Sequence, residues 1–106
     1  MDKITEDRLT KVALLLEKFL ELHPDEQNWL YPLLGRAEKR AIAVLSEIQG
    51  HALTYEEVAK LTDSHPNTVK SILYALERGG AAFKEGSTKK WISPKGGQYR
   101  KLMKLD

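Results

Sequence analysis

The chain of 106 residues contains no cysteine, which excludes disulfide bonds, thiol catalysis and cysteine-bound zinc. Its three histidines, His23, His51 and His65, are far apart in the sequence and do not have the spacing of metal ligands. No apolar run approaches the roughly 20 residues that a membrane-spanning helix needs, and the N-terminus lacks the pattern of a signal peptide. We therefore expect a cytoplasmic protein with no metal or other cofactor.

What the chain does have is an ordinary globular composition, with 42% hydrophobic and 30% charged residues, at a length that fits one small domain. The net charge of +2 is unevenly distributed. Residues 1–50 carry 7 basic and 9 acidic side chains, residues 51–106 carry 10 and 6, and the window 64–104 carries 9 and 2. A basic half beside an acidic half indicates a polyanionic partner for one end of the chain.

Residues 1–35 predict a helix followed by a connector, and we expect this segment to mediate dimerisation. Between about Thr5 and Leu22, apolar residues cover nearly half of the helical wheel, which is more than one packed face needs. Either this helix contacts a partner subunit as well as its own domain, or it makes one broad core contact. The candidate dimerisation residues are Leu9, Val12, Leu16, Phe19 and Leu20. In the connector, the residues expected to anchor to the core are Trp29, Leu30, Leu33 and Leu34.

Residues 36–106 predict short helices and one β-hairpin. Thr54 and Glu57 have the spacing of a capping box, Asp63 tolerates the left-handed conformation that a tight turn requires, and Pro66 fits the first turn of a helix. The expected helices cover residues 36–49, 55–62, 66–78 and 98–105, and the expected extended segments cover 51–53, 81–84 and 90–93. The loop 85–89 then forms the tip of a basic hairpin.

The helix that begins at Pro66 has two different faces. With 100° per residue, Ile72, Leu73 and Leu76 fall within about 60° of Val69 and form an apolar face. The opposite face carries amide, ammonium, hydroxyl, phenol and guanidinium groups, from Asn67, Lys70, Ser71, Tyr74 and Arg78. Such groups can hydrogen-bond to base edges and to phosphates.

The expected elements follow one another as helix, turn, helix, glycines, basic hairpin and final helix. In this order the sequence resembles the winged helix-turn-helix DNA-binding proteins, in particular small MarR- and ArsR-like transcriptional regulators. The resemblance covers about Arg36 to Leu105 and is carried by residues 53–61, 67–80 and 91–96. It implies a mainly α fold with a small β-hairpin wing, here with an extra N-terminal helix: residues 1–35 dimerise and residues 36–106 bind DNA. It also implies that the helix from Pro66 enters the major groove and that the hairpin tip lies along the backbone or minor groove.

The candidate DNA-binding residues come from the outer helix face, the hairpin and the start of the preceding helix. They are Thr54, Tyr55, Asn67, Thr68, Lys70, Ser71, Tyr74, Arg78, Lys84, Lys89 and Lys90. Three residues depart from the family pattern. Ser64 replaces a usually apolar residue, His65 stands where a serine or threonine cap is commoner, and Pro66 lacks a backbone donor. Trp91 is expected to pack in the hairpin or against the first helix.

The expected function is sequence-specific binding of double-stranded DNA by a homodimeric transcriptional regulator. The alternatives are a winged-helix adaptor that binds protein and a plasmid or phage replication accessory protein. An enzyme is not expected. Asp63, Ser64 and His65 are adjacent in a tight turn and cannot adopt a triad geometry, and the sequence has no nucleophile elbow, phosphate-binding glycine loop or acidic metal cluster. Nothing in the sequence marks an inducer pocket.

Overall fold

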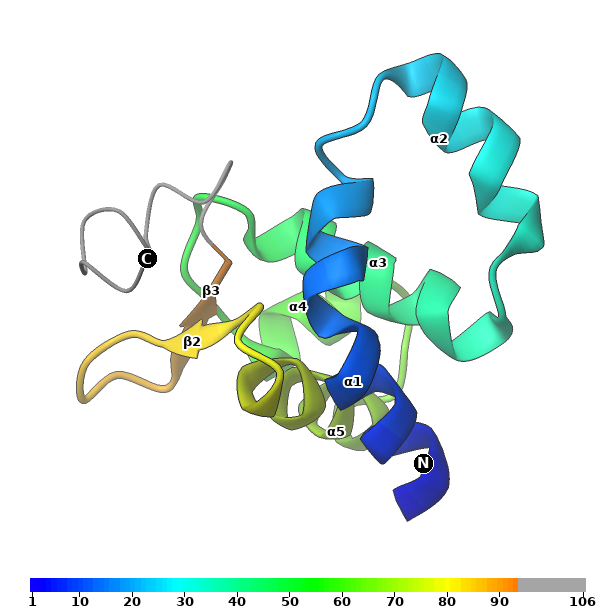
Figure 1. Ribbon diagram of the computed structural model, residues 1–106. Helices are drawn as coiled ribbons and strands as arrows, with labels where there is room; N and C mark the ends of the chain where they lie inside the picture. Colours follow the sequence, from blue (N-terminus) through cyan, green and yellow to red (C-terminus); the bar gives the residue numbers. More distant parts are fainter. Residues whose placement is uncertain (94–106) are drawn as a thin grey trace.

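The structure, a computed structural model, describes residues 1–93 and is mainly helical with a small antiparallel sheet (Figure 1). The helices are α1 (Lys3–Phe19), α2 (Pro24–Leu30), the 3-10 helix η1 (Tyr31–Leu33), α3 (Arg36–Ile48), α4 (Tyr55–Leu61) and α5 (Pro66–Arg78). The strands are β1 (Leu53–Thr54), β2 (Phe83–Lys84) and β3 (Lys90–Ile92). The mainly α fold class with a small sheet is thus confirmed, while the helix expected over 98–105 lies outside the described residues.

The helix α1 differs from the expected one at both ends. It begins at Lys3 because the Asp2 carboxylate accepts a hydrogen bond of 2.7 Å from the Thr5 amide and so caps the helix. This hydrogen bonding from Thr5 holds the pKa of the Asp2 carboxyl below its ordinary value. At the other end the helix stops at Phe19, three residues before the expected Leu22.

The apolar stripe of α1 is used by the chain's own core. Leu9, Leu16 and Phe19 are only 0%, 4% and 9% exposed, while Val12 and Leu20 are half-buried against the same core. Packing in the chain's own core therefore accounts for most of the surface of Leu9, Leu16 and Phe19, and their part in a dimer stays a prediction. Of the two alternatives for this helix, these residues make the broad core contact, against α5 and α3.

The connector anchors through only half of its expected residues. Leu30 and Leu34 pack partly buried against the core, whereas Trp29 and Leu33 are each 73% exposed. The expectation that Trp29 and Leu33 anchor the connector is therefore wrong. The reason is geometric: α2 is a short helix that lies away from the body of the protein, so only one side of it meets the core (Figure 1).

The crossing of α1 and α5 is unusually close. Gly79, the residue after α5, lies against the methyl group of Ala13 and the carbonyl of Thr10, and a Cβ atom at position 79 would overlap both. The Thr10 hydroxyl also donates a 3.0 Å hydrogen bond to the carbonyl of Ala75. Glycine is thus required at position 79 by contact with α1, although its φ of −87° is open to any residue.

The segment from β1 to α5 forms two helices joined by a tight turn, as the sequence predicts. The Glu57 amide donates to the Thr54 hydroxyl at 3.1 Å, and the Thr54 amide donates to the Glu57 carboxylate at 2.9 Å, which completes the capping box of α4. These hydrogen bonds from Thr54 lower the pKa of the Glu57 carboxyl. In the turn, Asp63 adopts the expected left-handed conformation, with φ of 50°.

The helix α5 begins and packs as expected. His65 takes the cap position, where its Nδ1 atom accepts a 3.1 Å hydrogen bond from the backbone N–H of Asn67. The imidazole thus satisfies a free N–H group at the start of the helix, as a serine or threonine hydroxyl would. Pro66 opens the helix. The residues predicted to form its apolar face are all buried: Val69, Ile72, Leu73 and Leu76.

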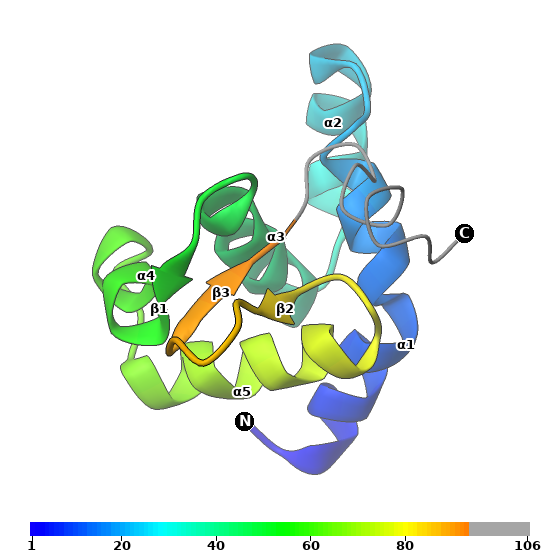
Figure 2. The ribbon, with the colours of Figure 1, turned by 90° about the vertical axis from the view of Figure 1, so that its left-hand side faces the viewer.

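The three strands form one sheet in the order β1-β3-β2, in which β3 pairs antiparallel with both neighbours. Leu53 of β1 pairs with Trp91, and Phe83 of β2 pairs with Ile92. At the base of the hairpin, the Ser93 hydroxyl donates a 2.9 Å hydrogen bond to the carbonyl of Ala81. The strand before α4 is therefore joined to the hairpin after α5, and the sheet lies beside α5 (Figure 2).

No helix within residues 1–93 combines the length and apolar character that crossing a membrane would require.

Candidate nucleic-acid interface

The outer face of α5 is formed by Asn67, Lys70, Ser71, Tyr74 and Arg78, and residues 1–93 cover it only in part. Asn67, Lys70 and Arg78 are exposed, and Ser71 and Tyr74 are half-buried. The packing of the opposite face into the core fixes the orientation of the helix. Amide, hydroxyl and cationic groups are thus held in a fixed arrangement on one open surface, as recognition of a groove requires.

One edge of this outer face borders a small hollow between α4, α5 and the hairpin. We call it the lysine hollow; it has a volume of about 220 Å³ and lies among Tyr55, Lys70, Tyr74, Lys84, Lys89 and Trp91. Five of these six residues are candidate DNA-binding residues from the sequence. The fold thus brings together residues that are up to 34 positions apart in the chain.

Aromatic rings support the lysines of this hollow. The Lys84 ammonium lies 5.3 Å from the ring centre of Trp91 and 5.4 Å from that of Tyr74, and it donates a 3.4 Å hydrogen bond to the Tyr74 hydroxyl. The Lys70 ammonium lies 5.5 Å from the ring centre of Tyr55. Tyr74 meets Trp91 edge to face, with ring centres 5.1 Å apart. Cation–π attraction therefore limits the positions of the charges without neutralising them.

Within the described part of the chain, the lysine hollow has no acidic partner. Within residues 1–93 the ion pairs are Arg8 with Glu38 at 2.8 Å and His23 with Asp25 at 3.7 Å, so Lys70, Lys84 and Lys89 have no carboxylate within 4.0 Å. Three positive charges that share one hollow repel each other, and an anion bound between them would relieve that repulsion. The hollow is thus suited to an oxyanion such as a phosphate.

Two other candidate residues lie outside the lysine hollow. Thr54 is half-buried and its hydroxyl already accepts the capping hydrogen bond from Glu57. Lys90 pairs with Thr54 across β1 and β3, and strand alternation places its side chain on the opposite face of the sheet from Trp91. There it adds a lesser lowering of the pKa of the Glu57 carboxyl, after the hydrogen bonds from Thr54.

The remaining candidate, Thr68, lines a different basic hollow, which the sequence analysis did not identify. We call it the arginine hollow; it has a volume of about 430 Å³ and lies among Met1, Thr5, Arg8, Arg36, Ala37, Arg40 and Thr68. The spacing of Arg36 and Arg40, one helical turn apart, indicates two cations on one side of α3. The sequence does not tell which side of α3 meets α5, so their proximity to Thr68 is visible only in the fold.

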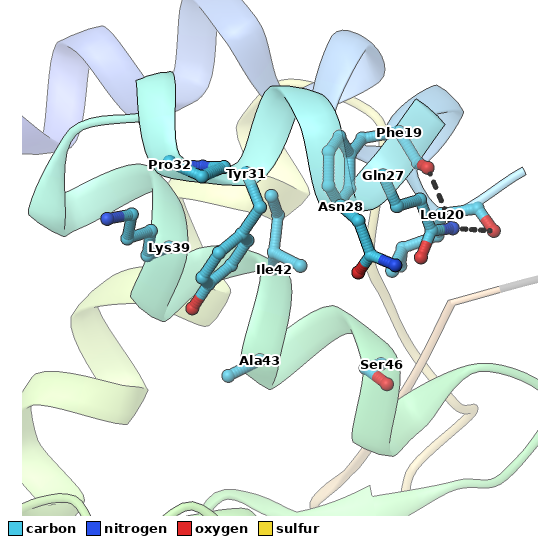
Figure 3. Close-up of a pocket in the computed structure, with 10 residues that line it drawn as sticks. All are labelled: Phe19, Leu20, Gln27, Asn28, Tyr31, Pro32, Lys39, Ile42, Ala43 and Ser46. Carbon is cyan, nitrogen blue, oxygen red and sulfur yellow. Dashed lines mark hydrogen bonds between the residues drawn. The ribbon is translucent and has the colours of Figure 1, made fainter. Parts of the chain in front are cut away.

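Two further depressions border α2 and η1. The first, of about 370 Å³, lies between these helices and α3, and Lys39 is the charged residue on its wall (Figure 3). Tyr31 and Asn28 extend across it toward Ala43 and Ser46 of α3 (Figure 3). At its edge the Gln27 side-chain amide donates hydrogen bonds of 3.1, 3.2 and 3.1 Å to the carbonyls of Phe19, Leu20 and Leu22, at and just after the end of α1.

The second depression, the apolar groove, lies between α1 and the connector. It has a volume of about 340 Å³, and its lining residues are Val12, Leu15, Leu16, Lys18, Phe19, Leu22, Leu30, Leu33, Leu34 and Glu38. Leu15 on one wall is 65% exposed and Leu33 on the other is 73% exposed. Large apolar side chains at such exposure are typical of a contact surface rather than of a solvated one.

Within residues 1–93 there is no group of three acidic, histidine or cysteine side chains that could hold a metal ion. Comparison with protein families, with curated proteins and with solved structures gives no match to this chain. The geometry of the outer face of α5 and of the hollows beside it is therefore the basis on which a function can be inferred.

Proposed function

We propose that this protein is a winged helix-turn-helix DNA-binding protein that acts as a transcriptional regulator. In this proposal α4 and α5 are the helix-turn-helix, and the β2–β3 hairpin, joined to β1, is the wing. The observation that carries it is the partly open outer face of α5 next to a lysine hollow for which residues 1–93 supply no acidic partner. The net charge of +7 over residues 64–104 supports the same conclusion.

The proposed binding mode follows from the diameter of an α-helix and the width of the major groove. An α-helix with its side chains is about 10–12 Å across, and the major groove of DNA is about 12 Å wide, so α5 fits the groove with its outer face toward the bases. Asn67 and Ser71 would then contact base edges. The lysine hollow would bind the phosphate backbone at the border of the groove, because ammonium groups make charge-assisted hydrogen bonds to phosphate oxygens.

Titration of the protein with a 20-base-pair duplex of random sequence tests this function. We expect fluorescence anisotropy at 50 mM NaCl to give a dissociation constant of about 10⁻⁵ M or tighter, with affinity falling as salt is raised. In vitro selection on duplex libraries then identifies the preferred sequence. An absence of duplex binding at 50 mM NaCl would contradict the proposal and favour the adaptor that binds protein.

We also propose a homodimer, in which the apolar groove packs against the apolar groove of a second copy. A two-fold contact requires one patch to be complementary to itself. Support for this proposal comes from the groove itself, which combines a depression with the exposed apolar side chains of Leu15 and Leu33 on its walls. A dimer that reads two successive major grooves needs its two α5 helices about 34 Å apart.

Sedimentation velocity tests the dimer. The wild-type chain is expected to be dimeric at tens of micromolar, and the variant Leu15→Glu/Leu33→Glu is expected to be a folded monomer whose melting temperature does not depend on protein concentration. Ile4→Glu is the matched control, since Ile4 is 80% exposed but lies outside the groove, and this variant should remain dimeric. A wild-type monomer at that concentration would overturn the dimer but leave DNA binding intact.

A further inference from the structure

The arginine hollow brings together the start of α1, the start of α3 and Thr68 of α5. Arg36 and Arg40 lie one turn apart on α3, both are exposed, and neither forms an ion pair with residues 1–93. Arg8 is different, because its guanidinium is paired with the Glu38 carboxylate at 2.8 Å. Two unpaired guanidinium groups therefore line this hollow.

The arginine hollow and the lysine hollow lie on opposite sides of α5. Thr68 lines the former and Lys70 lines the latter. Two residues in sequence correspond to about 200° around an α-helix, so these side chains leave α5 in nearly opposite directions. The outer face of α5, which includes Asn67 and Arg78, lies between them.

A helix in the major groove has one phosphate backbone on each of its two sides, because the groove is about as wide as the helix with its side chains. If the lysine hollow meets one strand, the opposite side of α5 meets the other. We propose that the arginine hollow is a second phosphate-binding site, in which Arg36 and Arg40 bind the backbone of the strand opposite to that bound by the lysine hollow. This inference rests on the proposed DNA-binding function.

The charges around the arginine hollow favour phosphate. Its neighbouring carboxylates are already engaged: Glu38 pairs with Arg8, and Asp2 accepts the hydrogen bond from the Thr5 amide. A guanidinium presents two parallel N–H groups to phosphate oxygens, which gives a directional contact that a lysine does not give. The contact would therefore fix the register of α5 in the groove as well as add affinity.

Salt-dependent titration of the random duplex tests the inference. Arg36→Gln/Arg40→Gln removes two phosphate contacts, so the slope of log affinity against log salt concentration should become shallower by about 1.8. The control variant Lys11→Gln/Lys60→Gln removes the same charge from exposed positions outside both hollows and outside the apolar groove, and it should keep the wild-type slope. Glu38→Gln releases Arg8 and should steepen the slope by up to about 0.9.

A strand-specific measurement separates this role from a general loss of charge. On a duplex obtained by selection, ethylation of phosphates on both strands should interfere with wild-type binding, and Arg36→Gln/Arg40→Gln should lose the interference on one strand only. Should the double variant melt early, each single variant is tested for a slope change of about 0.9. If the folded arginine variant keeps the wild-type salt slope and shows ethylation interference on both strands, this inference alone is overturned. If the wild-type chain binds no duplex, the proposed DNA-binding function is overturned as well.

Discussion

Replacing Lys70, Lys84 and Lys89 together with glutamine is expected to weaken binding to random duplex by about 100-fold at 50 mM salt and to make the slope of log affinity against log salt shallower by about 2.7. Each lysine that neutralises a phosphate releases condensed counterions from the DNA, and the loss of three such contacts removes that entropy gain. The effect should be large because no carboxylate within residues 1–93 already neutralises these ammonium groups.

Two further variants show whether the loss of positive charge from the lysine hollow causes the weaker binding to duplex DNA. Lys3→Gln/Lys11→Gln/Lys60→Gln loses the same charge from exposed lysines outside the lysine hollow and the apolar groove, and it is expected to bind with nearly wild-type affinity. Exchange of the three hollow lysines for arginine keeps the charge and is expected to keep the slope. Equal weakening by the control triple variant would show that net charge, and not the hollow, determines binding.

The largest expected effect on stability is that of Gly79→Ala. The added methyl group would overlap Ala13 and the Thr10 carbonyl, so α1 and α5 must move apart. Overpacking of this kind costs about 2–3 kcal/mol, which for a domain of this size corresponds to a decrease in melting temperature of roughly 10 °C or more. Chemical denaturation and thermal melting followed by circular dichroism measure both quantities.

Gly35→Ala is the matched control for this substitution. Position 35 also has a negative φ, and the atoms near an added Cβ belong to the flexible side chain of Glu38, so the cost should stay below about 1 kcal/mol. Ala13→Gly in the Gly79→Ala background removes one of the two overlaps and should recover part of the lost stability. Equal stability of Gly79→Ala and the wild-type chain would contradict the close crossing of α1 and α5.

The parts of the fold that could be predicted from sequence are those with local causes. The capping box of Thr54 and Glu57, the left-handed turn at Asp63 and the start of α5 at Pro66 each depend on residues within one turn of each other. The helical periodicity of the apolar residues was also enough to predict the buried face of α5. In contrast, α1 begins at Lys3, before the expected start at about Thr5, because Asp2 caps it.

The features that could not be predicted depend on contacts between distant segments. The sequence indicates lysines on α5 and the hairpin, but only the fold sets Trp91 beneath Lys84. The arginine hollow joins the starts of α1 and α3 to Thr68 of α5, and no local pattern encodes that proximity. Trp29 was expected in the core because it is apolar, yet hydrophobicity does not tell which side of a short helix meets the body of the protein.

The two tryptophans of the chain lie in contrasting surroundings, and this gives the protein its own optical probes. Trp91 is 1% exposed and has the Lys84 ammonium 5.3 Å from its ring centre, whereas Trp29 is 73% exposed on α2. A chain with Trp29→Phe keeps a single indole at the floor of the lysine hollow. Its intrinsic emission would then follow the occupancy of that hollow directly, without an attached dye.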